Sequence, residues 1–138
     1  MLEHVLSEDW ENGGFGFYIH WPFCTAKCPY CDFNSHVRNN IDQKQWLRSY
    51  LSEINRVSKN TSNRSLNSVF FGGGTPSLIE PWVINDILNE IQKYWKTKDI
   101  FEVTLEANPG SVDAKNFKAY RSAGVNRVSM GIQSLNEK

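Results

Sequence analysis

The chain has 138 residues with equal numbers of acidic and basic side chains, and its 40% hydrophobic content is typical of a folded globular domain. The balanced charge argues against nucleic acid as a partner, because nucleic-acid-binding domains are usually basic. No apolar stretch approaches the roughly 20 residues that span a bilayer, and residues 1–12 lack the apolar segment of a signal peptide. We therefore expect a cytoplasmic protein with reduced cysteines.

Hydrophobic periodicity and turn residues predict alternating strands and helices after a polar lead-in at residues 1–14. In chain order we expect a strand at 16–21, a helix at 42–58, a strand at 68–71, a helix at 81–95, a strand at 100–107, a helix at 113–123 and a strand at 126–133. This β-α-β-α-β-α-β order implies an α/β fold with a parallel sheet and right-handed crossovers. A closed (β/α)8 barrel takes about 250 residues. We therefore expect residues 15–138 to form a partial (β/α) barrel, truncated after about four strands, at the N-terminal end of a longer protein.

The three cysteines of the chain follow the first predicted strand. Cys24, Cys28 and Cys31 have the spacing C-x3-C-x2-C. Three thiolates can hold three irons of a 4Fe–4S cluster, whereas a ferredoxin site supplies four cysteines. An open metal position admits an exogenous ligand. Three buried structural cysteines, or a structural zinc-binding module with His20 or His36 as fourth ligand, are the alternatives, although we expect His20 to be hydrogen-bonded.

Further motifs lie where the other predicted strands end, which is the edge that carries the active site in parallel α/β folds. The second strand runs into the glycine motif, residues 72–76 (Gly-Gly-Gly-Thr-Pro), where missing side chains let the backbone approach a ligand. The third strand ends at Glu106, whose carboxylate can accept two ribose hydroxyls. An ion pair between Glu106 and Arg127 inside the barrel is the alternative. The fourth strand ends at Gln133.

Four segments together resemble the radical S-adenosylmethionine (SAM) superfamily, in the branch of oxygen-independent coproporphyrinogen III oxidase and the HemW-type heme chaperone. They are residues 18–24, 72–77, 105–110 and 124–134. In that superfamily the reduced cluster cleaves SAM to a 5′-deoxyadenosyl radical. The resemblance implies that Cys24, Cys28 and Cys31 hold a 4Fe–4S cluster. It also implies that SAM contacts Tyr18, Tyr30, Gly73, Gly74, Thr75, Glu106 and Gln133.

The two members of this branch differ just after the third cysteine. The oxidase carries a further cysteine two residues beyond it, and this chain carries Phe33 there. The pattern therefore resembles the heme chaperone, which also binds heme, in a region further along the chain, and passes it to acceptor proteins. Oxidative decarboxylation of coproporphyrinogen III to protoporphyrinogen IX, in porphyrin biosynthesis, is the alternative. The implied partners are heme, an unknown heme acceptor, and an electron donor such as a flavodoxin or an NADH system, with membrane association only through the acceptor.

Overall fold

The fold is built on a parallel sheet of four strands, as the sequence predicts. The computed structural model describes residues 8–110 and 114–136. The sheet has the order β1-β4-β5-β6, and every neighbouring pair is parallel. Its strands are β1 (Gly16–Trp21), β4 (Ser65–Gly73), β5 (Lys96–Ala107) and β6 (Arg127–Met130).

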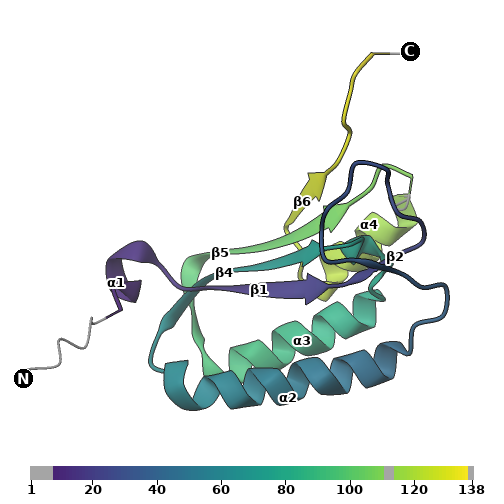
Figure 1. Ribbon diagram of the computed structural model, residues 1–138. Helices are drawn as coiled ribbons and strands as arrows, with labels where there is room; N and C mark the ends of the chain where they lie inside the picture. Colours follow the sequence, from purple (N-terminus) through teal and green to yellow (C-terminus); the bar gives the residue numbers. More distant parts are fainter. Residues whose placement is uncertain (1–7, 111–113, 137–138) are drawn as a thin grey trace, which may run out of the picture.

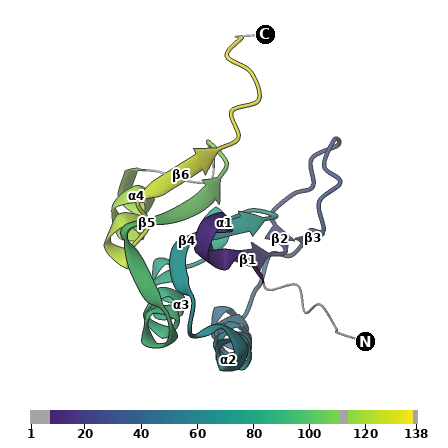
Figure 2. The same cartoon turned by 90° about the vertical axis from the view of Figure 1, so that its left-hand side faces the viewer.

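Three helices cover one face of this sheet, two of them beneath it in Figure 1 and the third beside its last two strands in Figure 2. They are α2 (Gln43–Thr61), α3 (Pro81–Tyr94) and α4 (Ala114–Ala123). The core fills the space between sheet and helices, and its largest fully buried side chains are Trp21, Trp95, Phe71, Leu66, Ile79, Ile84, Ile87, Ile91 and Leu105. In the described part of the chain no helix covers the other face of the sheet (Figure 2), and Tyr18 on β1 is 59% exposed.

Local sequence explains where the helices begin and which face they bury. Asp42 caps α2, because its side chain accepts a hydrogen bond of 3.0 Å from the Gln45 backbone N–H. Pro81 opens α3, at a position where its missing N–H costs no helical hydrogen bond. The buried side chains of α3 recur at helical spacing, and they are Val83, Ile84, Ile87, Leu88 and Ile91. No helix in the described part of the chain is long and apolar enough to cross a membrane.

Short elements that the sequence did not predict flank the main ones. A single helical turn, α1 (Trp10–Gly13), lies within the expected lead-in, and the 3-10 turn η1 (Pro76–Leu78) follows β4. Two strands of two residues each, β2 (Phe23–Cys24) and β3 (His36–Val37), pair in parallel. They bracket residues 25–35, which we call the cysteine loop, and so hold its two ends together at the edge of the sheet.

The fourth strand is shorter than predicted. We expected it to reach Gln133, but β6 ends at Met130, which pairs with Ala107, the last residue of β5. Alternation of apolar and polar residues continues in the sequence beyond Met130. The neighbouring strand β5 ends at Ala107, however, so the strand pairing stops there. β4 and β5 both begin earlier than expected, since Ser65 pairs with Lys96. The expected start of the third helix, Asp113, lies outside the described residues.

Candidate cofactor site at the carboxyl ends of the strands

A cleft of about 200 Å³ lies where β4, β5 and β6 end. Its lining consists of Phe33, Gly73, Gly74, Thr75, Pro76, Glu106, Ala107, Asn108, Ser129, Met130, Gly131 and Gln133. The sequence predicts seven residues that contact SAM. Five of them line this one cleft, although they come from three separate segments. The two tyrosines of that set, Tyr18 and Tyr30, do not line it.

The glycine motif packs so closely on Trp21 and Cys24, just before the cysteine loop, that side chains would not fit. Gly73 has φ +121°, and a Cβ there would lie 2.6 Å from the Trp21 carbonyl oxygen. A Cβ on Gly74 would lie 2.9 Å from Cys24 Sγ. The Gly74 backbone N–H donates to the Trp21 carbonyl at 2.7 Å. Glycine is thus required at both positions, and the first thiol lies directly against the motif expected to bind SAM.

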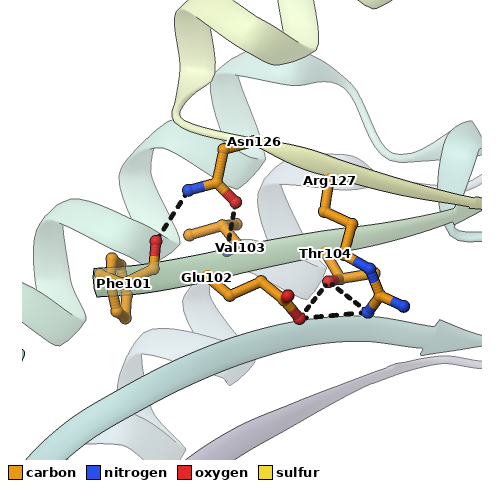
Figure 3. A network of polar contacts seen from close by, with 6 residues as sticks. All are labelled: Phe101, Glu102, Val103, Thr104, Asn126 and Arg127. Atoms are coloured by element: carbon orange, nitrogen blue, oxygen red, sulfur yellow. Dashed lines mark hydrogen bonds and ion pairs between the residues drawn. The ribbon is translucent and has the colours of Figure 1, made fainter.

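Glu106 is held at the cleft by the glycine motif. Its Oε2 accepts a hydrogen bond of 3.1 Å from the Gly73 backbone N–H. The alternative that Glu106 pairs with Arg127 is wrong, because Arg127 Nη1 lies 3.1 Å from Glu102 Oε1 and also donates to Thr104 Oγ1 at 3.3 Å (Figure 3). The carboxylate of Glu106 thus faces the cleft without a guanidinium partner at Arg127, which leaves it able to accept hydroxyl groups of a ligand.

Asn126 fixes the position of β6 beside β5 (Figure 3). Its Nδ2 donates to the Phe101 carbonyl oxygen at 2.7 Å, and its Oδ1 accepts from the Val103 N–H at 2.8 Å. The side chain therefore replaces two strand-pairing hydrogen bonds just before β6 begins. The resulting register sets Ser129 opposite Glu106, so both line the same cleft.

Gln133 reaches the cleft from beyond the strand. It has φ +59°, a left-handed conformation that is uncommon for a residue other than glycine. The Ser134 N–H bonds to the Ile132 carbonyl oxygen at 2.6 Å, so the backbone turns tightly around Gln133. The expected role at the cleft is thus compatible with the structure, although the expected strand conformation is not.

The three cysteines are free thiols with different exposure. Cys24 is buried in β2, Cys31 is half-buried and Cys28 is exposed, and the Cys31 N–H bonds to the Cys28 carbonyl oxygen at 3.1 Å in a tight turn. A hydrogen bond to Cys28, and then the charge of Cys28, raises the pKa of Tyr30. In the described part of the chain no three His, Cys, Asp or Glu side chains are gathered closely enough to hold a metal ion. A cluster shared by all three thiols therefore requires Cys28 and Cys31 to approach Cys24.

Tyr18 and His20 lie on the face of β1 that has no helix over it. Burial, and then the negative charge of Glu106, raises the pKa of Tyr18, so its hydroxyl stays protonated at neutral pH. His20 Nε2 lies 3.0 Å from the Asn34 carbonyl oxygen, and its Nδ1 lies 3.4 Å from the Tyr18 hydroxyl. This agrees with the expectation of a hydrogen-bonded His20.

Several cleft residues were not predicted to belong to the site. Asn108 follows Glu106 within a segment that the resemblance already singled out, so its place in the chain was a usable signal. Ser129 and Met130 lie in β6, where alternation predicts opposite faces, yet both line the cleft because the strand ends there. In the sequence, Phe33 only distinguished the heme chaperone from the oxidase. The structure adds that Phe33 lines the cleft.

Comparison with known proteins places these features in a family. The model of the radical SAM superfamily matches residues 18–138. Heme chaperone HemW from Haemophilus influenzae is 47% identical over 125 residues, which cover 87% of this chain and 33% of that protein. HemW from Escherichia coli is 38% identical over 122 residues, covering 88% and 32%.

A solved structure gives the same result for the fold. The coproporphyrinogen III oxidase HemN from Escherichia coli, described as a radical SAM enzyme, matches with a TM-score of 0.79 and 26% identity over 88% of this chain and 28% of that one. The chain therefore spans about a third of the length of these relatives. Its fold, its motifs and the family match agree, and the chain belongs to the radical SAM superfamily.

Proposed function

We propose that the protein is a HemW-like heme chaperone, which binds a 4Fe–4S cluster, SAM and heme and transfers heme to an acceptor protein. The observation that carries the proposal is the cleft, where Gly73, Glu106 and Gln133 meet from three segments beside the cysteine loop. Phe33 lines the same cleft at the position where the oxidase carries a further cysteine. The similarity to two proteins named heme chaperone HemW supports the same reading.

The residues present fit the cluster and SAM. Cys24, Cys28 and Cys31 are free thiols within one short segment, and thiolates are the ligands that iron–sulfur clusters take. Gly74 has no side chain where Cys24 Sγ approaches, so the first thiol can lie directly against the glycine motif. We propose that the three cysteines hold the cluster, which when bound and reduced supplies the electron for SAM cleavage. Metal binding of this kind couples to the closure of the loop that carries its ligands.

The cleft residues then bind and orient SAM. The glycine motif places Gly73 and Gly74 in the lining of the cleft, where glycine lets the backbone approach a ligand closely. Glu106, already fixed by the Gly73 N–H, is placed to accept the two ribose hydroxyls. Thr75 is buried at the cleft wall, and its N–H donates to the Phe23 carbonyl oxygen at 2.8 Å, so this wall is tied to β2. Gln133 completes the cleft from the segment after β6.

The remaining parts of the proposal concern the complete protein. We propose that heme binds in a region outside this chain, and that the partners are a heme acceptor protein and an electron donor such as a flavodoxin or an NADH system. We propose a cytoplasmic location, with membrane association only through the acceptor.

A second function is favoured by one specific observation, the structural match to coproporphyrinogen III oxidase over 88% of this chain. In that case the protein would decarboxylate the propionate side chains of coproporphyrinogen III. Phe33, in place of the further cysteine, weighs against it.

One experiment separates the two functions. The complete protein is reconstituted anaerobically with iron and sulfide, and iron content, SAM binding and heme binding are measured. The same sample is then incubated with SAM, a reductant and coproporphyrinogen III, and protoporphyrinogen IX is sought by chromatography, with a Cys28→Ala variant as the cluster-free control. Heme binding without product supports the chaperone, whereas product that depends on Cys28 identifies an oxidase and refutes the chaperone proposal. A protein that binds no heme and forms no product also contradicts the chaperone proposal.

A further inference from the structure

His20 occupies a position where the cysteine loop, the glycine motif and helix α2 all meet. Its backbone lies on β1 opposite Gly72. Its carbonyl oxygen accepts a hydrogen bond of 2.6 Å from the Tyr50 hydroxyl on α2. The main chain of His20 is thus held by the sheet and by α2, which fixes the point from which its side chain extends.

The ring of His20 contacts both segments that are expected to hold the cofactors. Nε2 lies 3.0 Å from the carbonyl oxygen of Asn34, near the end of the cysteine loop. A Cβ built on Gly73 would lie 2.8 Å from both Cε1 and Nδ1, so the ring covers that glycine directly. Among the described residues, the bond to Asn34 is the one hydrogen bond that joins residues 25–35 to the sheet.

The partners of the ring determine which nitrogen carries the proton. A backbone carbonyl oxygen can only accept, so Nε2 must be the donor to Asn34. In the neutral imidazole Nδ1 is then an acceptor, and the Tyr18 hydroxyl, 3.4 Å away, can donate to it. Tyr18, His20 and Asn34 therefore form a continuous chain from the open face of β1 to the cysteine loop, with every donor matched to an acceptor.

We propose that His20 is a positioning residue, which holds the cysteine loop against the glycine motif so that the cluster ligands and the SAM-binding cleft keep a fixed relative position. The inference deepens the proposed function and rests on it for the identity of the ligands. Gly73 contacts both the His20 ring and the cleft. The ring lies against the position where a Cβ of Gly73 would be, and the Gly73 N–H donates to Glu106. Release of the ring would free the loop and uncover the glycine that orients Glu106.

The test uses the complete protein and compares His20→Phe with His20→Gln. Phenylalanine keeps a ring over Gly73 but cannot donate to Asn34, whereas the amide of glutamine can. In the apo protein we expect the backbone amides of residues 25–35 in His20→Phe to exchange hydrogen about five- to tenfold faster, as the loss of one hydrogen bond predicts. His20→Gln should stay within about twofold of the unmodified protein, because the donor is kept. His36→Phe, the same change at an exposed histidine of β3, is the matched control and should leave the exchange unchanged.

A second measurement follows the consequence for the ligand. In the reconstituted protein, His20→Phe should keep its iron content but bind SAM up to about tenfold more weakly. The electron paramagnetic resonance signal of its reduced cluster should respond less to added SAM, and His20→Gln should restore both. If His20→Phe fails to fold, Tyr18→Phe tests the same chain of hydrogen bonds and should show a smaller acceleration of exchange in the same segment.

The outcomes separate this inference from the proposed function. Unchanged exchange in His20→Phe, or in Tyr18→Phe where that variant replaces it, overturns the positioning role. Equal loosening in His20→Phe and His20→Gln overturns the hydrogen bond as its cause. A complete protein that binds neither cluster nor SAM overturns the proposed function, while the exchange comparison in the apo protein still decides the role of His20.

Discussion

Glu106 offers the sharpest test of the cleft, because the same strand supplies its control. Replacement of Glu106 by Gln keeps the size of the side chain and an oxygen that can still accept from the Gly73 N–H. The amide has only one accepting oxygen and no charge, so at most one of two ribose hydroxyls keeps an acceptor. Hydrogen bonds to a charged group contribute about 1.5–3 kcal/mol and neutral ones about 0.5–1.5 kcal/mol. We therefore expect a loss of about 2–3 kcal/mol, or roughly 30- to 160-fold in SAM affinity.

The control is Glu102→Gln. Glu102 lies two residues earlier on the same face of β5 and pairs with Arg127 rather than lining the cleft. Equilibrium dialysis of SAM against the reconstituted complete protein, with iron content measured in each variant, gives both affinities. SAM affinity equal to that of the unmodified protein in Glu106→Gln would remove Glu106 from the binding site. An equal loss in Glu102→Gln would show that the effect comes from charge in general and not from the cleft.

Alanine at the same position separates binding from folding. Glu106→Ala removes the acceptor of the Gly73 N–H as well as the carboxylate. An unsatisfied backbone donor costs about 1–3 kcal/mol. The variant should therefore lose stability as well as SAM affinity, while Glu106→Gln loses mainly affinity. Denaturant unfolding of the two variants checks this, and equal stability of both would show that the bond to Gly73 contributes little.

Three further predictions concern the loop, the glycine motif and the wall of the cleft. Replacement of any one of the three cysteines by alanine should abolish the cluster, because two thiolates do not hold it, and iron content equal to that of the unmodified protein would contradict this. Gly73→Ala should destabilise the protein by about 2–6 kcal/mol, since a positive φ costs about 1–3 kcal/mol and the clash with the Trp21 carbonyl oxygen adds a similar amount. Denaturant unfolding measures this loss, and a loss below about 1 kcal/mol would contradict both contributions. Tyr120→Phe should cost about 1–3 kcal/mol, because the Tyr120 hydroxyl donates to the carbonyl oxygens of Ser77 and Ile79 beside the cleft wall. Burial, and then the charge of Glu80, raise the pKa of Tyr120 to about 12 from an ordinary 10.0; the folded state therefore binds this proton more tightly, and its contribution to stability, complete below pH 10, is lost as pH rises toward 12. Unfolding measured across that range should show a weaker pH dependence in Tyr120→Phe, and identical slopes would refute the assignment.

Local signals in the sequence were enough for the main elements of the fold. Asp42 followed by apolar residues at helical spacing predicted α2, and the structure shows Asp42 as its cap. Pro81 marked the start of α3 in the same way. These signals act within one or two helical turns, so they can be read without knowledge of the neighbours.

Features that depend on a partner strand were missed. The predicted strand begins at residue 100, yet β5 begins at Lys96 because Ser65 and Leu66 on β4 pair with its first two residues. The opposite error occurred in β6, where the apolar pattern continues to Ile132 but the pairing ends at Met130 with the end of β5. Strands as short as β2 and β3 carry no periodicity that a sequence could display.

In the candidate site, too, the motifs could be predicted and the contacts across the fold could not. The resemblance to the family predicted Gly73, Glu106 and Gln133, and the structure brings them to one cleft. The partner of Arg127 could not be read from the sequence, because Glu102 and Glu106 lie on the same face of one strand. Arg127 pairs with Thr104, midway between them, so that the side-chain contacts and not the strand register decide for Glu102. The contact of His20 with Asn34 joins residues 14 positions apart across a loop, and no local pattern encodes it.

The order of strands in the sheet also bears on how the protein is made. Because β1, β4, β5 and β6 are neighbours in the order of synthesis, each newly made strand finds its docking edge already present. The expected cluster ligands leave the ribosome first, then the glycine motif, then Glu106 and Gln133, so residue 133 completes the cleft. A nascent chain can therefore assemble this part of the sheet, and the cleft at its edge, by successive addition of strands.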